Sequence, residues 1–273
     1  MAAKKEVAQK NEYAVSTDVL GLFEADAGRG IQLDAEDVAL PFLKVLSRQD
    51  AKMDELETAR AGDIYNSVTN EVYKGAEGFV VVPCHYARQF LEWAPRGVGT
   101  GSPVNIYNVG DNMPTTSRDA ADNKDYIDGH EDGHYLEETH QHYVVVIEED
   151  GTMNTALISM KSTQLKKSRK WNSMVASRTM IGKNGLPFQP PRYSHMYRLK
   201  TTHEKNSKGD WHGWEITLEG PITDAAIFAT AKQFADSISK GEVTVKHVDE
   251  SFQGASMPQN DVVEEPTDDE TPW

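Results

Sequence analysis

The segment that best matches a catalytic motif begins at His130 and reads His-Glu-Asp-Gly-His. The pattern H-E-x-x-H binds zinc when both histidines share one helical face and the glutamate acts as general base. Gly129 and Gly133 oppose a helix here, and a segment typical of a strand follows at once. A turn-forming loop is therefore favoured, and a zinc hydrolase that uses His130, Glu131 and His134 is the alternative.

Other catalytic and metal-binding signatures are missing from the sequence. It contains no G-x-x-x-x-G-K-[ST], no G-x-G-x-x-G and no G-x-S-x-G. Cys84, the only cysteine, follows Pro83 in an apolar stretch, which is typical of a small buried side chain. We interpret His140 and His142, two residues apart on one strand face, as ordinary strand histidines rather than metal ligands. We therefore expect a protein that is not an enzyme and needs no metal or other cofactor.

Charge is strongly segregated along the chain, so the net charge of −15 is misleading. Between Lys161 and Lys205, eleven Lys and Arg residues accompany a single acid, Glu204, which gives +10. From Val248 to the end, eight Asp and Glu residues accompany no Lys or Arg, which gives −8. Cations that track phosphates and aromatic rings that stack on bases are what sequence-independent single-strand binding needs, and the basic segment contains both.

The predicted DNA-binding residues are cations and aromatic residues of this segment and of the preceding strand: Arg88, Trp93, Lys166, Lys167, Arg169, Lys170, Trp171, Arg178, Lys183, Tyr193, Tyr197, Arg198, Lys200 and Lys205. Trp171 also falls on the apolar stripe of its helix, so core packing is the favoured alternative for that residue. Tyr193 and Tyr197 share one strand face and are the better candidates for base stacking.

The elements that must position these residues follow a recognisable order. Apolar patterning predicts strands at 79–93 (bent at Pro83), 134–147 and 153–160, a helix at 162–181, and strands at 193–202 and 211–218. This β-β-β-α-β-β order is that of an OB-fold. We therefore predict a mainly β (α+β) protein: an OB-type five-stranded β-barrel with a helix between strands three and four, a C-terminal helix and a disordered acidic tail.

The predicted domain organisation has three parts. Residues 1–35 form a flexible N-terminal segment, 36–240 the OB-like DNA-binding domain, and 241–273 a disordered acidic tail. Residues 94–133, rich in Gly, Pro, Asn and Asp, are expected to be mainly a long insertion loop. Because no run of about 18 apolar residues and no signal-peptide pattern occur, we expect a cytoplasmic protein with no membrane partner.

The chain ends in an acidic tip: Asp268-Asp269-Glu270-Thr271-Pro272-Trp273. This tip resembles that of bacterial single-stranded-DNA-binding proteins, which end in three acids, an apolar residue, proline and phenylalanine. The two aspartates and the proline match, Glu270 replaces the third acid, and Thr271 and Trp273 replace the apolar residue and the phenylalanine. Tailed-phage single-strand binders share the layout of OB core, acidic tail and terminal aromatic residue. The stretches 40–46, 62–66 and 79–93 also resemble a group of tailed-phage proteins.

The resemblance implies a core that binds single-stranded DNA without sequence specificity in phage DNA replication, recombination or repair. It also implies a tail that competes with DNA and recruits a replication protein (polymerase, helicase or primase) through Asp268, Asp269, Glu270, Pro272 and Trp273. The sequence is compatible with a homo-oligomer. The rival interpretation is a virion or scaffold interaction protein, in which charge segregation serves assembly.

Overall fold

A computed structural model of the chain describes residues 15–31, 37–56, 58–95, 97–98, 101–129, 132–206, 209–243, 245 and 247. The chain divides into two compact units, Met1–Val38 and Ala39–Trp273. In the first unit, α1 (Thr17–Ala25) begins after the N-cap Ser16, whose hydroxyl accepts a hydrogen bond from the Val19 amide, and none of its residues is buried. The domain limits proposed from the sequence remain predictions, and the acidic tip lies outside the described residues.

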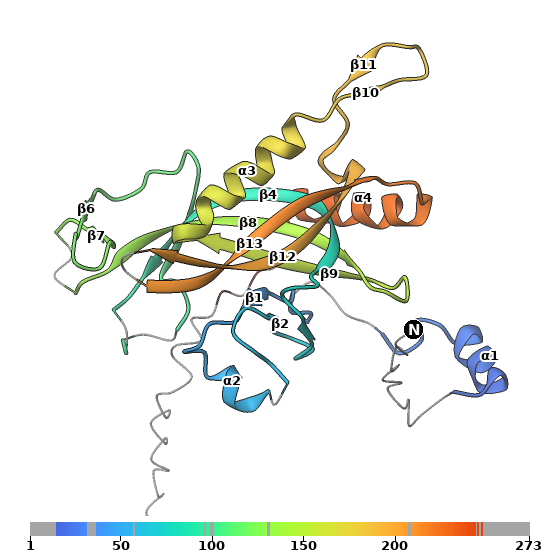
Figure 1. The fold of residues 1–273 in the computed structure, drawn as a ribbon, viewed down its shortest axis with the longest axis horizontal. Helices are drawn as coiled ribbons and strands as arrows, with labels where there is room; N and C mark the ends of the chain where they lie inside the picture. Colours follow the sequence, from blue (N-terminus) through green and yellow to red (C-terminus); the bar gives the residue numbers. More distant parts are fainter. Residues whose placement is uncertain are drawn as a thin grey trace, which may run out of the picture. The chain divides into compact units, whose positions relative to one another are not determined.

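The second unit is mainly β, as predicted (Figure 1). Its long strands are β4 (Phe79–Trp93), β8 (Tyr135–Ile147), β9 (Met153–Lys161), β12 (His195–Asn206) and β13 (Gly209–Pro221). Its short strands are β1 (Leu43–Val45), β2 (Ile64–Asn66), β3 (Val72–Tyr73), β5 (Asn105–Asn108), β6 (Thr116–Arg118), β7 (Asp125–Ile127), β10 (Met180–Ile181) and β11 (Pro187–Phe188). Its helices are α2 (Lys52–Glu55), α3 (Leu165–Ala176), α4 (Ala225–Ser239) and the short 3-10 turns η1 (Ser162–Gln164) and η2 (Arg192–Ser194). No helix in the described part of the chain has both the length and the apolar character needed to cross a membrane.

The main sheet is organised around the antiparallel β4–β8 ladder, which runs from Val80 opposite Ile147 to Trp93 opposite Tyr135. Valines and aromatic residues along both strands favour extended backbone. The ladder shifts register between Pro83 and His85, because proline has no N–H to donate and the strand forms a bulge there, as predicted. The bulge bends β4, so that its two halves serve different neighbours: β12 pairs with residues 79–81, and β5 pairs with residues 89–92.

The five long strands have the spatial order β9-β8-β4-β12-β13, with α3 between β9 and β12 in sequence. Along the chain, these five strands and α3 follow the predicted β-β-β-α-β-β order. The predicted closed barrel is wrong, because in the described structure no backbone pairing joins β9 to β13 and the sheet remains a curled half-barrel. The small β1-β2-β3 sheet packs across the gap and contributes Leu43 and Ile64 to the main core.

The gap between β9 and β13, which we call the seam, is joined by two substitutes for strand pairing. On one side, the Leu157 amide of β9 donates to the Pro41 carbonyl at 2.8 Å. On the other side, the amide group of the Gln164 side chain replaces a neighbouring backbone. Its Oε1 accepts a hydrogen bond from the Trp214 amide at 3.2 Å, and its Nε2 donates to the His212 carbonyl at 3.4 Å. A single amide side chain therefore satisfies the edge of β13 where a barrel would place a neighbouring strand.

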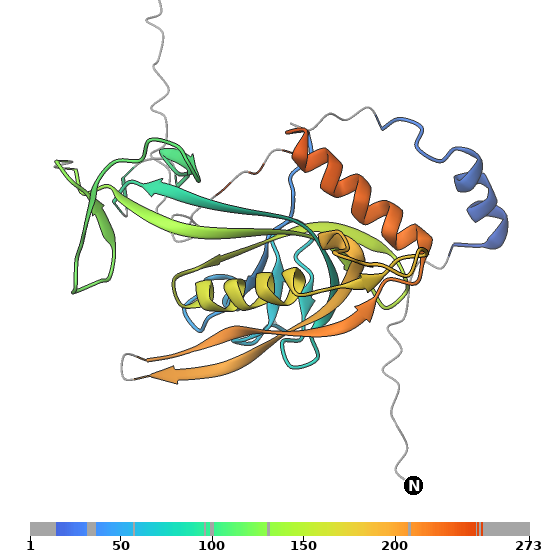
Figure 2. The same cartoon turned by 90° about the horizontal axis from the view of Figure 1, so that it is seen from above.

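Helices α3 and α4 pack on opposite faces of the sheet, as side-chain alternation along a strand requires. Figure 2 shows α3 (yellow) and α4 (red-orange) as separate layers. Val81 and Val144 lie in the core cluster that contains Trp171 of α3. The adjacent Val82 and Val145 lie in the cluster that contains Phe234 of α4.

Within residues 94–133 the structure forms only the short strands β5, β6 and β7, and the other described residues there lie outside helices and strands. The helix expected at 162–181 ends at Ala176, because Met180–Ile181 pairs instead with Pro187–Phe188 in a hairpin. This hairpin projects beyond α3 (Figure 1) and leaves Ile181 and Leu186 well exposed. Beyond residue 240, where the tail was expected, His247 is buried with its ring centroid 5.6 Å from that of Phe42.

Replacing Gln164 with alanine should destabilise the second unit by about 1–3 kcal/mol, because it leaves the Trp214 N–H and the His212 carbonyl without their partner. Urea unfolding followed by tryptophan fluorescence would measure the change. The matched control is Gln233→Ala on the exposed surface of α4, which should change stability by less than about 0.5 kcal/mol. Equal stability of the two variants would contradict the role given to Gln164.

Candidate nucleic-acid interface

Helix α3 presents cations because its apolar side is fixed in the core. Ser168 and Trp171, three residues apart, are fully buried. Lys166, Arg169 and Lys170 project outward and are exposed. Residues spaced by three and four positions are neighbours on a helix surface, so these three cations form one group. Lys167 differs from them, because it is ion-paired with Glu204.

Strand β4 places aromatic side chains beside this group. Tyr86, Arg88 and Phe90 alternate along one face of β4, and the Arg88 guanidinium lies 5.7 Å from the Phe90 ring centroid. Across the ladder, Arg88 is opposite His140. Burial lowers the pKa of His140, and the charges of Arg169 and Arg88 act in the same direction. We call the residues of this shared region the α3–β4 surface: Tyr86, Arg88, Phe90, Lys166, Arg169 and Lys170.

A buried polar cluster anchors α3 to the sheet below this surface. The Ser168 hydroxyl lies 2.7 Å from His140 Nδ1 and 2.7 Å from His142 Nε2. The His142 ring stacks on Trp171, with a centroid distance of 4.6 Å and an interplanar angle of 19°. Burial lowers the pKa of His142 well below its usual value, and the neighbouring Arg192 charge acts in the same direction. The cluster is sealed from solvent at Ser168, so we assign the serine–histidine contacts to structure rather than to nucleophilic catalysis.

The structure brings four predicted residues together on the α3–β4 surface: Arg88, Lys166, Arg169 and Lys170. Trp171 takes the core position that was the favoured alternative for it, while the base-stacking prediction for Tyr197 requires correction. Trp171 and Tyr197 are both 0% exposed and pack edge to face at 5.9 Å, so neither is available to a base. Tyr193 is half-buried against Phe228 of α4, at 5.4 Å.

The remaining predicted cations are dispersed. Arg198 and Lys200 alternate with the buried Tyr197 and Leu199, so they lie on the outer face of β12, where Arg198 pairs with Glu219. Arg178 donates to the Met174 carbonyl at 3.0 Å, just beyond α3. Lys183 lies in the turn of the β10–β11 hairpin, and Lys205 lies near the far end of β12. The tail residues Asp268, Asp269, Glu270, Pro272 and Trp273 lie outside the described residues.

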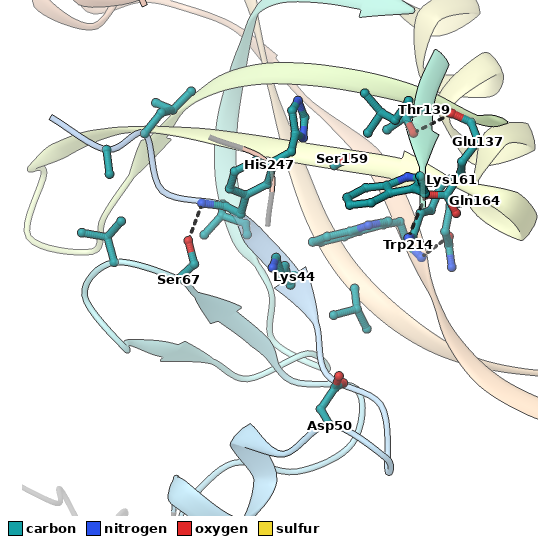
Figure 3. Close-up of a pocket in the computed structure, with 18 of the residues that line it drawn as sticks. Lys44, Asp50, Ser67, Glu137, Thr139, Ser159, Lys161, Gln164, Trp214 and His247 are labelled. Atoms are coloured by element: carbon teal, nitrogen blue, oxygen red, sulfur yellow. Dashed lines mark hydrogen bonds and ion pairs between the residues drawn. The ribbon is translucent and has the colours of Figure 1, made fainter. Parts of the chain in front are cut away.

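A second candidate is the cavity at the seam, with a volume of about 690 Å³ (Figure 3). Trp93 and Trp214 help to line it, and Trp93 is the one predicted DNA-binding residue in it. OB-folds bind oligonucleotides near this position, on the strand two–three face. Its charges are balanced, however, since Lys44 and Lys161 share it with Asp50 and Glu137, and Lys161 pairs with Glu137 at 3.0 Å. The α3–β4 surface is therefore the better match for a polyanion.

The metalloprotease pattern is not assembled in the described residues. His134 precedes β8 in non-helical backbone, and its Nδ1 lies 2.8 Å from Glu92, while His130 and Glu131 lie outside the described residues. Within the described ranges, no group of three His, Cys, Asp or Glu side chains has metal-binding geometry. Cys84 is buried, as predicted, and burial raises the pKa of its thiol to about 12, which opposes a nucleophilic role.

Sequence reasoning missed Tyr86, Phe90, Asn172 and Arg192. The alternation of Tyr86, Arg88 and Phe90 within one strand is a signal that could have identified the aromatic part of the surface. Arg192 belongs to the basic segment, but only its side-chain contacts with Asn172 of α3 and His142 of β8 show its position.

The model of a family described as Pam3 phage gp34-like protein matches residues 10–244. Neither the curated proteins nor the solved structures contain a significant match to the chain.

Stability should fall as pH is lowered from 7 to 5, because His142 has a lower pKa in the folded chain than the 6.5 of an unfolded chain. Below pH 6.5 the unfolded chain takes up a proton that the folded chain does not. The free energy of unfolding is therefore fully retained above pH 6.5 and falls as the pH is lowered below it. The loss from one such histidine approaches about 1.4 kcal/mol per pH unit. Urea titrations at pH 7, 6 and 5 would measure it.

His142→Gln should flatten this pH dependence, since it removes the titrating group and keeps a side chain that can accept from Arg192. The control is His203→Gln, an exposed histidine paired with Asp210 at 2.9 Å. If the two variants keep the same slope, His142 is not a source of the acid sensitivity.

Proposed function

The chain belongs to the Pam3 phage gp34-like protein family, and we propose that this phage protein binds single-stranded DNA without sequence preference. The observation that carries the proposal is the α3–β4 surface, where four cations and two half-buried aromatic rings share one region. Phosphates would meet Arg88, Lys166, Arg169 and Lys170, and a base would stack on Phe90.

The balance of charge at this surface supports a polyanionic ligand. Glu138 is an acid beside the α3–β4 surface. Its Oε1 lies 3.0 Å from His140 Nε2 and 3.6 Å from Arg169 Nη2. Arg169 keeps 62% of its side chain exposed, so the pair leaves its guanidinium accessible. Exposed pairs of this kind contribute little free energy and can exchange for phosphate.

The strand order β9-β8-β4-β12-β13 supports oligonucleotide binding only in general, since OB-folds of this order bind on the strand two–three face and not at the position of the α3–β4 surface. We further propose that the tail residues from Asp268 to Trp273 recruit a replication protein such as a polymerase, helicase or primase. In this scheme the core holds the strand and the tail holds the partner.

Replacing Lys166, Arg169 and Lys170 together with alanine should weaken binding to oligo-dT roughly 100-fold at 0.1 M salt and reduce the salt slope by about two units, because each lost phosphate contact removes about 0.7 from it. Tryptophan fluorescence titrations at two or more salt concentrations would measure both quantities. The control is the triple alanine variant of Arg60, Lys232 and Lys240, which removes the same charge from exposed positions elsewhere. Equal losses in the two variants would reduce the effect to net charge and contradict a localised interface.

Replacing Phe90 with alanine should weaken oligo-dT binding by about 5- to 150-fold with little change in the salt slope, because stacking contributes about 1–3 kcal/mol per base and releases no counterion. The matched control is Phe228→Ala, since Phe228 is 39% exposed on α4. An unchanged affinity in the Phe90 variant would remove this ring from the DNA path.

A further inference from the structure

Arg192 opens η2 and inserts its guanidinium between α3 and β8. Its Nη1 donates to Asn172 Oδ1 at 3.0 Å, and its Nη2 lies 3.0 Å from His142 Nδ1. The guanidinium carbon lies 5.5 Å from the Tyr86 ring centroid and 5.9 Å from that of Trp171. The Nε atom is buried and has no hydrogen-bond partner. A guanidinium has five N–H donors, and the contacts with Asn172 and His142 engage only two of them.

The charge of Arg192 has no opposing carboxylate in the described structure. The ionisable groups that face it are Tyr86, Tyr197 and Cys84, together with His85 and His142. Burial raises the pKa of Tyr86, Tyr197 and Cys84, and it lowers the pKa of His85 and His142, so all five are neutral at pH 7. Burial lowers the pKa of Arg192 itself to about 10, so the guanidinium stays charged.

A largely buried cation without a counter-charge is costly, since its hydration is lost and no ion pair replaces it. Packing alone would be served by an uncharged side chain of similar length. The arrangement makes physical sense if the counter-charge arrives with a ligand.

Tyr86 marks where such a ligand would bind. Its half-buried ring lies against Arg192, whose Nη1 donates to Asn172, and Arg88 follows two residues later on the same strand face. Arg88 and Arg192 both act on the Tyr86 hydroxyl as positive charges, and Glu138 acts on it as a negative charge.

We propose that Arg192, Arg88 and Asn172 form a subsite at Tyr86 for a single phosphate group. A guanidinium offers two parallel N–H donors that match two phosphate oxygens, a geometry that a lysine cannot reproduce. Resting on the proposed function, the occupant is one phosphodiester of the bound strand, which this subsite fixes in place. The lysines of α3 attract the strand, and Arg192 sets its position.

Inorganic phosphate is the direct probe. At matched ionic strength, 20 mM phosphate should raise the Tm of the wild-type chain by roughly 2–5 °C over chloride, because a ligand that binds only the folded state stabilises it. Arg192→Lys and Arg88→Lys keep the charge and lose the fork, so each should remove most of that shift, while Arg60→Lys should keep it. The absence of a shift in the wild-type chain would overturn the subsite, whether or not the Arg192 variant is stable.

Oligo-dT titration separates this inference from the proposed function. Arg192→Lys should weaken oligo-dT binding about tenfold without changing the salt slope, because the charge is retained. If wild-type protein binds phosphate at Arg192 but not oligo-dT, the subsite holds and the single-strand function fails. If oligo-dT binds wild type and Arg192→Lys equally well, the strand does not use Arg192, and the subsite is overturned while the single-strand function stands.

Discussion

The β4–β8 ladder is the constraint on which the rest of the second unit depends. At one end its valines form part of two cores, one covered by α3 and the other by α4. At the other end the same two strands continue past the core and carry Arg88, Phe90 and Glu138. Because strands β5, β7, β9 and β12 all pair with β4 or β8, this one register sets the positions of the candidate binding residues on the sheet.

Two aromatic residues of the basic segment pack in the core, while three of its cations lie on the surface. Trp171 and Tyr197, which look like base-stacking side chains among cations, form the packed floor under α3. Their burial fixes the helix so that Lys166, Arg169 and Lys170 face outward together. The rings that remain accessible come from β4, a segment distant in sequence, and only the fold brings them beside α3.

Strand positions and their order were predictable from local patterning, because alternating or β-branched runs and turn residues such as Asp150-Gly151 act over short distances. The site was predictable only in part. Composition identified the cations of α3, but whether Tyr197 is buried or exposed depends on contacts with residues far along the chain. Barrel closure could not be predicted for the same reason. It depends on whether β9 and β13 pair, and the residues of these two strands do not indicate that β1 lies between them.

The seam held by Gln164 has a consequence for how this fold can diverge. A closed barrel fixes its strand number and stagger together, so a one-residue insertion in any strand must be accommodated around the whole ring. Here the outer edges of β9 and β13 share no ladder in the described structure, and the side chain of Gln164, just after β9, bonds to the edge of β13 instead. Length changes near the ends of either strand can therefore be absorbed locally, and related chains can differ most in length along this line without altering the β4–β8 register.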